Sequence, residues 1–148
     1  MKKFKFKLET VLKVKSRVEE LRQKELKEAE VRREQARRQL AQRQEEMAAT
    51  VANYREQFQA NIDLYKANDY HRFIKWLSKQ IELATQHLEQ CEQEVHRRRL
   101  KLMEATREKK VLEKLKEKAY EEYKAEELRE EIKFLDELGT SQFFRQKD

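Results

Sequence analysis

The sequence predicts an all-α protein that forms a long two-helix antiparallel coiled-coil hairpin, with residues 1–148 as a single coiled-coil domain. Three observations support this prediction. The 148 residues include no proline and one glycine, and 43% are charged, which is typical of long helices rather than of a compact core. Apolar residues repeat at alternating spacings of three and four from Ile74 onward. A turn-forming stretch separates this repeat from a similar one upstream.

The first helix is expected over about residues 4–66. Its opening, FKFKLETVLKVK, alternates apolar residues with lysine, but Phe4 and Phe6 alone are too few to specify a strand. Helical spacing then links Phe4, Leu8, Val11, Val18 and Leu21. Farther along, an apolar stripe repeats by four, four and three, which favours straight or slightly right-handed winding: Met47, Val51, Tyr54, Phe58, Ile62 and Tyr65.

The turn is expected in KANDYH, residues 66–71, with the tip of the hairpin at 67–71. Asn68 or Asp69 can accept hydrogen bonds from free backbone amides and cap the second helix. If the chain reverses there, residue i faces roughly residue 137 minus i on the other helix. The alternative is one continuous helix in a parallel oligomer, which fits less well because the heptad phase is lost through this stretch.

The second helix is expected over about residues 72–138 and carries the clearest signal. Its heptad seam, interrupted by Arg98, Lys109 and Lys116, predicts a left-handed coiled coil. The seam comprises Ile74, Leu77, Ile81, Ala84, Leu88, Cys91, Val95, Leu102, Ala105, Leu112 and Ala119. Past Tyr123 the apolar stripe shifts to Leu128, Ile132, Leu135 and Leu138. Gly139 is then expected to end the helix, with 139–148 as a loose tail.

The formal net charge of +6 is unevenly distributed. Residues 1–30 carry 10 basic and 6 acidic groups, whereas residues 106–148 carry 11 and 12. A nucleic-acid binder needs a stripe of one sign, so the short arginine runs at 32, 37 and 97 are interpreted as solvated helix flanks. One cysteine, no membrane-spanning apolar run and a lysine-interrupted opening predict a reduced, cytoplasmic protein.

No catalytic, cofactor or metal site is expected. A two-helix rod lacks a concave, partly dry site, and one glycine cannot form a phosphate-binding loop. Paired glutamates fall at exposed helix positions, where they serve as ion-pair partners for lysines. His87 and Cys91 are four residues apart, but a stable metal site wants about four ligands, and Cys91 also fits the apolar seam.

Apolar residues near the tip exceed what a narrow seam needs. Phe73, Ile74, Trp76 and Leu77 spread around much of the second helix, opposite the aromatic residues of the first. Two interpretations remain open at this point. These side chains form either a wide aromatic core that plugs the end of the coil or an exposed docking patch.

Three segments in this order, FKFKLETVL, YHRFIKWL and VLEKLKEKAYEEYKAEELREEIKFLDELG, resemble the flagellar export protein FliJ family over essentially the whole chain. The resemblance implies a soluble component of the flagellar type III export apparatus, similar to the central stalk of rotary ATPases. It also implies three kinds of partner: the hexameric export ATPase FliI, the cytoplasmic domain of the export gate FlhA, and export chaperones. Such a protein is cytoplasmic and peripheral at the inner membrane.

By resemblance, Phe73 and Leu77 match the positions that bind the export gate, and Tyr54 is a neighbour on the first helix. Phe58 and Met47 are further candidates for the gate. For the ATPase ring, the geometry of a hairpin points to the base, where both termini lie. The candidates there are Phe4, Phe6, Leu8 and Leu12 on one helix, and Ile132, Leu135 and Asp136 on the other.

Two other functions fit the same architecture. One is the equivalent stalk of a virulence type III secretion system, which gene neighbourhood would separate from the flagellar protein. The other is a basic coiled-coil arm that binds structured RNA, suggested by the arginine runs and a pI near 9.3.

Overall fold

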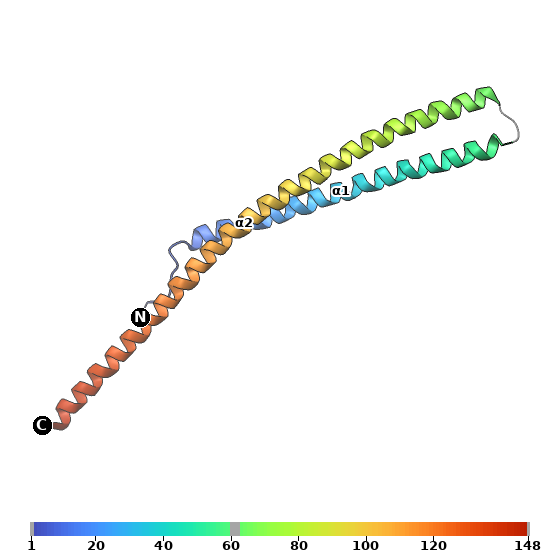
Figure 1. Ribbon diagram of the computed structural model, residues 1–148. Coiled ribbons are helices and arrows are strands. Elements are labelled where there is room, and N and C mark those ends of the chain that lie inside the picture. The colour runs from blue at the N-terminus through green and yellow to red at the C-terminus, as the bar shows by residue number, and fades with distance from the viewer. Residues whose placement is uncertain (1, 60–62, 148) are drawn as a thin grey trace. The chain divides into compact units, whose positions relative to one another are not determined.

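The computed structural model describes residues 2–59 and 63–147 and contains two helices, α1 (Glu9–Gln57) and α2 (Leu64–Lys147) (Figure 1). The described residues include no strand, so the predicted all-α class is confirmed. In the part of the chain that the structure describes, no helix is long and apolar enough to cross a membrane.

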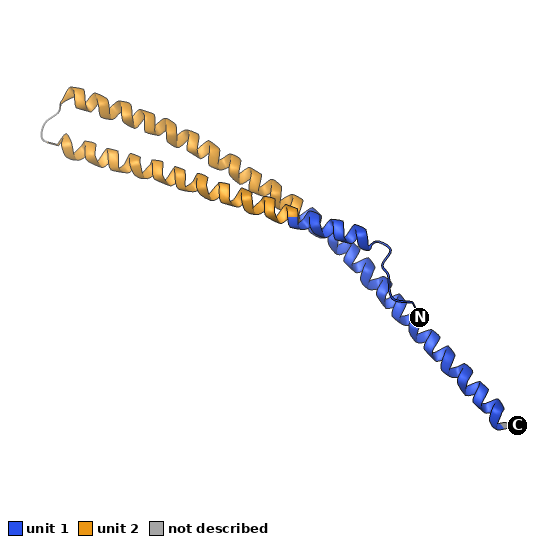
Figure 2. Cartoon of the chain, turned by 180° about the vertical axis from the view of Figure 1, so that it is seen from behind, with its two compact units in different colours: residues 1–20, 103–148 blue, residues 21–102 orange. Residues whose placement is uncertain are grey.

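The chain divides into two compact units, and both helices contribute to each (Figure 2). Unit 1 comprises Met1–Glu20 and Met103–Asp148, and unit 2 comprises Leu21–Leu102. Within unit 2, α1 and α2 run antiparallel on either side of the connection between Gln57 and Leu64. That residues 1–148 act as a single domain stays a prediction.

The predicted heptad seam of α2 is confirmed in both units. Its residues are buried or half-buried, and the alternating spacing of three and four begins earlier and ends later than predicted. In unit 2 the seam comprises Ala67, Tyr70, Ile74, Leu77, Ile81, Ala84, Leu88, Cys91, Val95, Arg98 and Leu102. In unit 1 it continues through Ala105, Lys109, Leu112, Lys116, Ala119 and Tyr123.

The seam of α1 differs from the predicted stripe. The side chains of Leu8, Val11 and Leu21 are exposed, and Tyr65, expected on the same arm, lies on α2 and is 87% exposed. Ile62 lies outside the described residues. The other predicted residues, Phe4, Val18, Met47, Val51, Tyr54 and Phe58, are half-buried. An eleven-residue stripe that continues to Tyr65 is nevertheless wrong, because α1 ends at Gln57. The positions of α1 that repeat by three and four and are buried or half-buried are Leu12, Lys15 and Glu19 in unit 1, then Arg22, Leu26, Ala29, Arg33, Ala36, Leu40, Arg43, Met47, Thr50 and Tyr54 in unit 2.

The turn lies earlier than predicted. Helix α1 ends at Gln57 rather than near 66, and α2 begins at Leu64, so Asn68 and Asp69 lie inside a helix. The cap is Asp63, whose carboxylate oxygen accepts a hydrogen bond from the Tyr65 amide at 3.0 Å. Helix across 66–71 is favoured because it brings two more residues into the seam, Ala67 and Tyr70.

The register changes accordingly. The numbers of facing residues add up to 123 for the ion pair of Glu25 with Arg98 in unit 2, and to 125 for Glu9 with Lys116 in unit 1. Residue i therefore faces about residue 125 minus i, roughly twelve fewer than predicted, because moving a turn by about six residues moves the register by twice that.

Both predicted ends of the hairpin are also wrong. Residues 2–8 are not helical, and α1 begins at Glu9, since lysines are unfavourable at the positive end of a helix dipole and Glu9 is favourable there. At the other end, Gly139 does not stop α2, which continues to Lys147. Gly139 has no positive φ, and one glycine costs a helix only about 1 kcal/mol.

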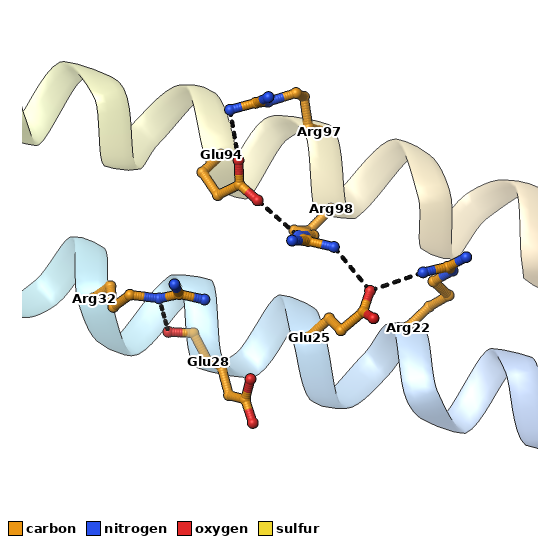
Figure 3. A network of polar contacts seen from close by, with 7 residues as sticks. All are labelled: Arg22, Glu25, Glu28, Arg32, Glu94, Arg97 and Arg98. Carbon is orange, nitrogen blue, oxygen red and sulfur yellow. Dashed lines mark hydrogen bonds and ion pairs between the residues drawn. The ribbon is translucent and has the colours of Figure 1, made fainter.

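Ion pairs across the seam fix the register in unit 2 (Figure 3). The carboxylate of Glu25 accepts hydrogen bonds at 3.0 Å from Arg22 on its own helix and from Arg98 on α2. The Nε of Arg98 donates to Glu94 at 2.7 Å, and Glu94 also pairs with Arg97. In unit 1, Lys109 donates to Glu19 at 3.2 Å and Lys15 donates to Glu108 at 2.8 Å.

These contacts shift carboxyl pKa values in one direction. A hydrogen bond from Arg22 lowers the pKa of Glu25, and one from Arg98 lowers the pKa of Glu94. The pKa of Glu19 is lowered first by Thr106 and then by Lys109. Glu19 is thus held in its charged form by side chains of α2 that it meets only when the helices are paired, whereas Glu25 and Glu94 depend first on an arginine of their own helix.

Truncation of a buried seam residue should destabilise the chain much more than truncation of an exposed one. Leu77 is fully buried (0% exposed), so Leu77→Ala should lower the free energy of unfolding by about 2–4 kcal/mol. Leu83→Ala, an exposed leucine of the same unit and helix, should change it by less than about 0.5 kcal/mol. Urea unfolding followed by circular dichroism measures both, and equal losses would contradict the assigned seam.

Stability should fall as the pH drops through the carboxyl range. Because the folded pKa values of Glu25 and Glu94 are lowered, their contribution is complete above the ordinary value of 4.5 and is lost progressively below it. Glu25→Gln with Glu94→Gln should therefore melt below wild type at pH 7, and the gap should close near pH 3.

The matched control for this pH series is Glu45→Gln on α1 of the same unit. It removes an exposed carboxylate that makes no ion pair with any described residue. Its melting temperature should follow that of wild type at every pH. A gap between wild type and the double variant that stays constant from pH 7 to pH 3 would refute the linkage.

Candidate interaction surfaces

A cluster of aromatic rings lies between α1 and α2 next to the turn in unit 2. The Tyr54 ring lies 4.8 Å from Phe58, 5.7 Å from Tyr70 and 5.3 Å from His71, measured between centroids. The Tyr54 hydroxyl is 3.4 Å from His71 Nε2, and the Tyr70 hydroxyl donates to Gln57 at 3.3 Å. These contacts are internal to the unit and join the two helices, as the aromatic-core interpretation predicts.

A second aromatic pair faces outward from α2. Phe73 and Trp76 stack with centroids 5.8 Å apart and planes inclined by 20°, and their side chains are 44% and 47% exposed. The guanidinium of Arg43 on α1 lies 5.3 Å from the centre of the Trp76 ring, a cation–π contact that holds the indole in place. We call Phe73 and Trp76 the outer aromatic pair.

The five residues predicted for the gate therefore have different environments. Phe73 is exposed, Leu77 is fully buried in the seam, Tyr54 and Met47 are half-buried on α1, and Phe58 is half-buried just after α1 ends. The sequence analysis included Trp76 in the possible docking patch but not among the residues predicted for the gate. Its three-residue spacing from Phe73 was a signal that the two rings share one face.

In unit 1, residues 2–8 lie along α2 (Figures 1 and 2). The Phe4 ring packs on Tyr120 and Tyr123, with centroids 5.3 and 5.5 Å away. The Tyr123 hydroxyl donates to the Lys2 carbonyl at 2.7 Å. Partial burial, followed by the Glu127 carboxylate, raises the pKa of the Tyr123 phenol. Residues 2–8 therefore cover a part of α2 that α1 itself does not reach.

Farther along α2, the side chains from Leu128 to Gln146 are all exposed. An apolar stripe runs along one side of this stretch, at spacings of four, three and three, and Leu135 within it is 62% exposed. We call it the C-terminal stripe, and it consists of Leu128, Ile132, Leu135 and Leu138. The shift of the apolar pattern past Tyr123 is the feature from which the sequence predicted it.

The residues predicted for the ATPase ring occupy two separate places in unit 1. Phe4, Phe6 and Leu12 are half-buried, and Leu8 is exposed. Ile132, Leu135 and Asp136 are exposed on α2. Phe4 contacts Tyr123, nine residues before Ile132, a separation of about 14 Å along a helix. The register shift explains this separation, since the predicted pairing had placed Phe4 opposite about residue 133.

The pair of His87 and Cys91 was the one metal candidate in the sequence. The Cys91 sulfur lies 3.8 Å from His87 Nε2, and Cys91 occupies a half-buried seam position. Among the described residues, no three His, Cys, Asp or Glu side chains gather closely enough to hold an ion.

Comparison with known proteins identifies a family. Searches of curated proteins and of solved structures gave no match. Residues 4–148 match the family described as Flagellar FliJ protein, which includes all of α1 and α2, the outer aromatic pair and the C-terminal stripe. On this evidence the chain belongs to the FliJ family of flagellar proteins.

Proposed function

We propose that this component of the flagellar export apparatus acts as a non-catalytic adaptor between the export ATPase and the export gate. The C-terminal stripe carries the proposal. A helical face with four exposed aliphatic side chains is stabilised when another protein covers it, since it gains nothing from exposure to water.

The hexameric export ATPase FliI is the proposed partner of the C-terminal stripe. Ile132 and Leu135 would enter apolar contacts in the ring, and Asp136 at its edge would pair with a basic group. Residues Phe4, Phe6, Leu8 and Leu12 form the second part of the proposed contact. Phe4 and Leu12 are half-buried against unit 1, so they act mainly by shaping the surface from which Leu8 projects.

The cytoplasmic domain of the export gate FlhA is the proposed partner of the outer aromatic pair. Large aromatic side chains, half-exposed and held by a stacking and a cation–π contact, are the groups that dominate binding energy at protein interfaces. Phe73 and Trp76 would make the direct contacts. Leu77 is buried in the seam and Tyr54, Phe58 and Met47 are half-buried, so these four residues would support the site by holding the two helices together rather than by direct contact. Export chaperones remain proposed partners without an assigned surface.

Two charged substitutions on the C-terminal stripe test the ring contact. In the export ATPase assay, wild-type chain should raise both the hexamer fraction and the turnover. Ile132→Asp with Leu135→Asp should weaken the binding of the chain to the ATPase by at least about tenfold, because each places a carboxylate where apolar contact is needed. Both side chains are exposed, so the melting temperature should stay unchanged.

The control for the ring contact is Lys133→Asp, which puts the same residue on another face of the same turn and should leave ATPase stimulation intact. Wild-type chain that changes neither hexamer fraction nor turnover would exclude the proposed function. Equal effects of the stripe variant and the control would exclude the stripe as the contact.

Truncation of the outer aromatic pair tests the gate contact. Phe73→Ala with Trp76→Ala should weaken binding to the isolated gate domain by about tenfold or more, because two aromatic contacts are lost. Leu83→Ala, an exposed residue of the same helix, should bind like wild type. Calorimetric titration measures the affinities. A large drop in melting temperature for Phe73→Ala alone would show instead that this ring belongs to the core.

A further inference from the structure

The excess positive charge of the chain is confined to one short segment. Residues 2–17 hold seven basic side chains and one acidic side chain, a net charge of +6 that equals the formal charge of all 148 residues. The remainder of the chain is therefore balanced in sign. We call residues 2–17 the basic segment. Its basic residues are Lys2, Lys3, Lys5, Lys7, Lys13, Lys15 and Arg17.

Most of these charges are not used within unit 1. Lys15 pairs with Glu108, and Glu9, the one acidic residue of the segment, pairs with Lys116. The other six basic side chains are exposed, and none lies within ion-pair distance of a described carboxylate. The charge is thus available to an external anionic partner.

The same segment exposes aliphatic side chains among its charges. Leu8, just before α1, is exposed, as are Val11 and Val14 in its first two turns, and Val14 is 50% exposed. Phe4 and Phe6, between the lysines, are half-buried. Lysines interleaved with exposed apolar residues are typical of segments that lie in the headgroup region of a membrane, where the charges meet anionic lipids and the apolar groups enter the acyl boundary.

We propose that the basic segment binds the surface of an anionic phospholipid bilayer directly. Lys2, Lys3, Lys5 and Lys7 contact headgroup phosphates, and Val11 and Val14 insert at the interface. Structured RNA fits less well, because an RNA contact makes no use of three exposed aliphatic side chains.

Three acidic side chains close to the basic segment should limit how strongly it binds an anionic membrane. Glu122, Glu126 and Glu130 of α2 line the same groove as residues 2–8. They repel anionic headgroups on that side, so the lysines must meet the membrane with the face turned away from α2. Binding should accordingly be peripheral and reversible, and screening by salt should release it.

Sedimentation with vesicles tests the proposal on the full chain. Wild type should bind vesicles of phosphatidylcholine with about 30% phosphatidylglycerol at about 50 mM salt and should dissociate from them at about 500 mM salt. It should not bind vesicles of phosphatidylcholine alone. Neutralising Lys2, Lys3, Lys5 and Lys7 to glutamine should weaken this binding by at least about tenfold. Val11→Ser with Val14→Ser should weaken it severalfold with all charges retained.

The matched control neutralises four exposed lysines of unit 2, Lys24, Lys27, Lys66 and Lys75, and should bind the vesicles like wild type. An equal loss for this control would attribute binding to net charge and overturn the proposal. Absence of wild-type binding to the anionic vesicles would also overturn it. Full binding by the valine variant, together with tighter binding of wild type to a structured RNA, would assign the segment to RNA instead.

The vesicle assay contains neither ATPase nor gate, so its outcome is independent of the proposed adaptor function. Circular dichroism of each variant confirms that helix content is unchanged. The substituted side chains are all exposed, so the folded units should persist in every variant.

Discussion

Unit 2 depends on one seam, in which apolar side chains of α2 pack against a face of α1 that includes alanines and charged side chains. The most buried residues in unit 2 show the asymmetry, with Leu77 and Val95 on α2 and Ala29 and Ala36 on α1. Alanine brings the two backbones close together, but it buries little surface of its own. Pairing therefore relies on the leucines, isoleucines and valines of α2 and on the aliphatic stems of charged side chains on α1.

In a seam of this kind, apolar contact alone does not fix how far one helix is shifted along the other. A slip of one heptad would place equivalent side chains opposite each other, since the three and four spacing is the same throughout. The cross-helix ion pairs break this equivalence because Glu25 meets Arg98 and Glu19 meets Lys109 in only one register. Individually such pairs contribute little, but a slip of one heptad would place Glu25 opposite Cys91 or Ala105 and leave it without this partner. One cost remains, since the buried Nε of Arg33 has no described hydrogen-bond partner.

The sequence allowed prediction of the seam of α2 but not that of α1. Leucine, isoleucine and valine mark the first, whereas Lys15, Glu19 and Arg33 occupy inward positions of the second, where hydrophobic patterning gives no signal. The exposed Val11 and Leu21 supplied a false stripe instead.

The same limit applies to the candidate surfaces. Phe73 and the C-terminal stripe were recognisable as apolar groups outside the heptad phase. Leu77 points into the seam and Phe73 points out of it. Which of the two faces the partner helix depends on how α1 and α2 pair, and the sequence alone does not give this. The turn was missed because Asn68 and Asp69 and the actual cap, Asp63, are equally good capping types.

The position of the turn determines how much of α2 is left for partners. Helix α2 has 84 residues and α1 has 49, so one helix must extend past the other. With Asp63 as the cap, the first residue of α1 meets Lys116, and residues 2–8 extend the cover only as far as Tyr123. A turn at 67–71 would instead have paired the start of α1 with residues near 128 and covered part of the C-terminal stripe. The early turn therefore leaves the aliphatic residues near Ile132 beyond the reach of α1, and their exposure follows from the position of the turn.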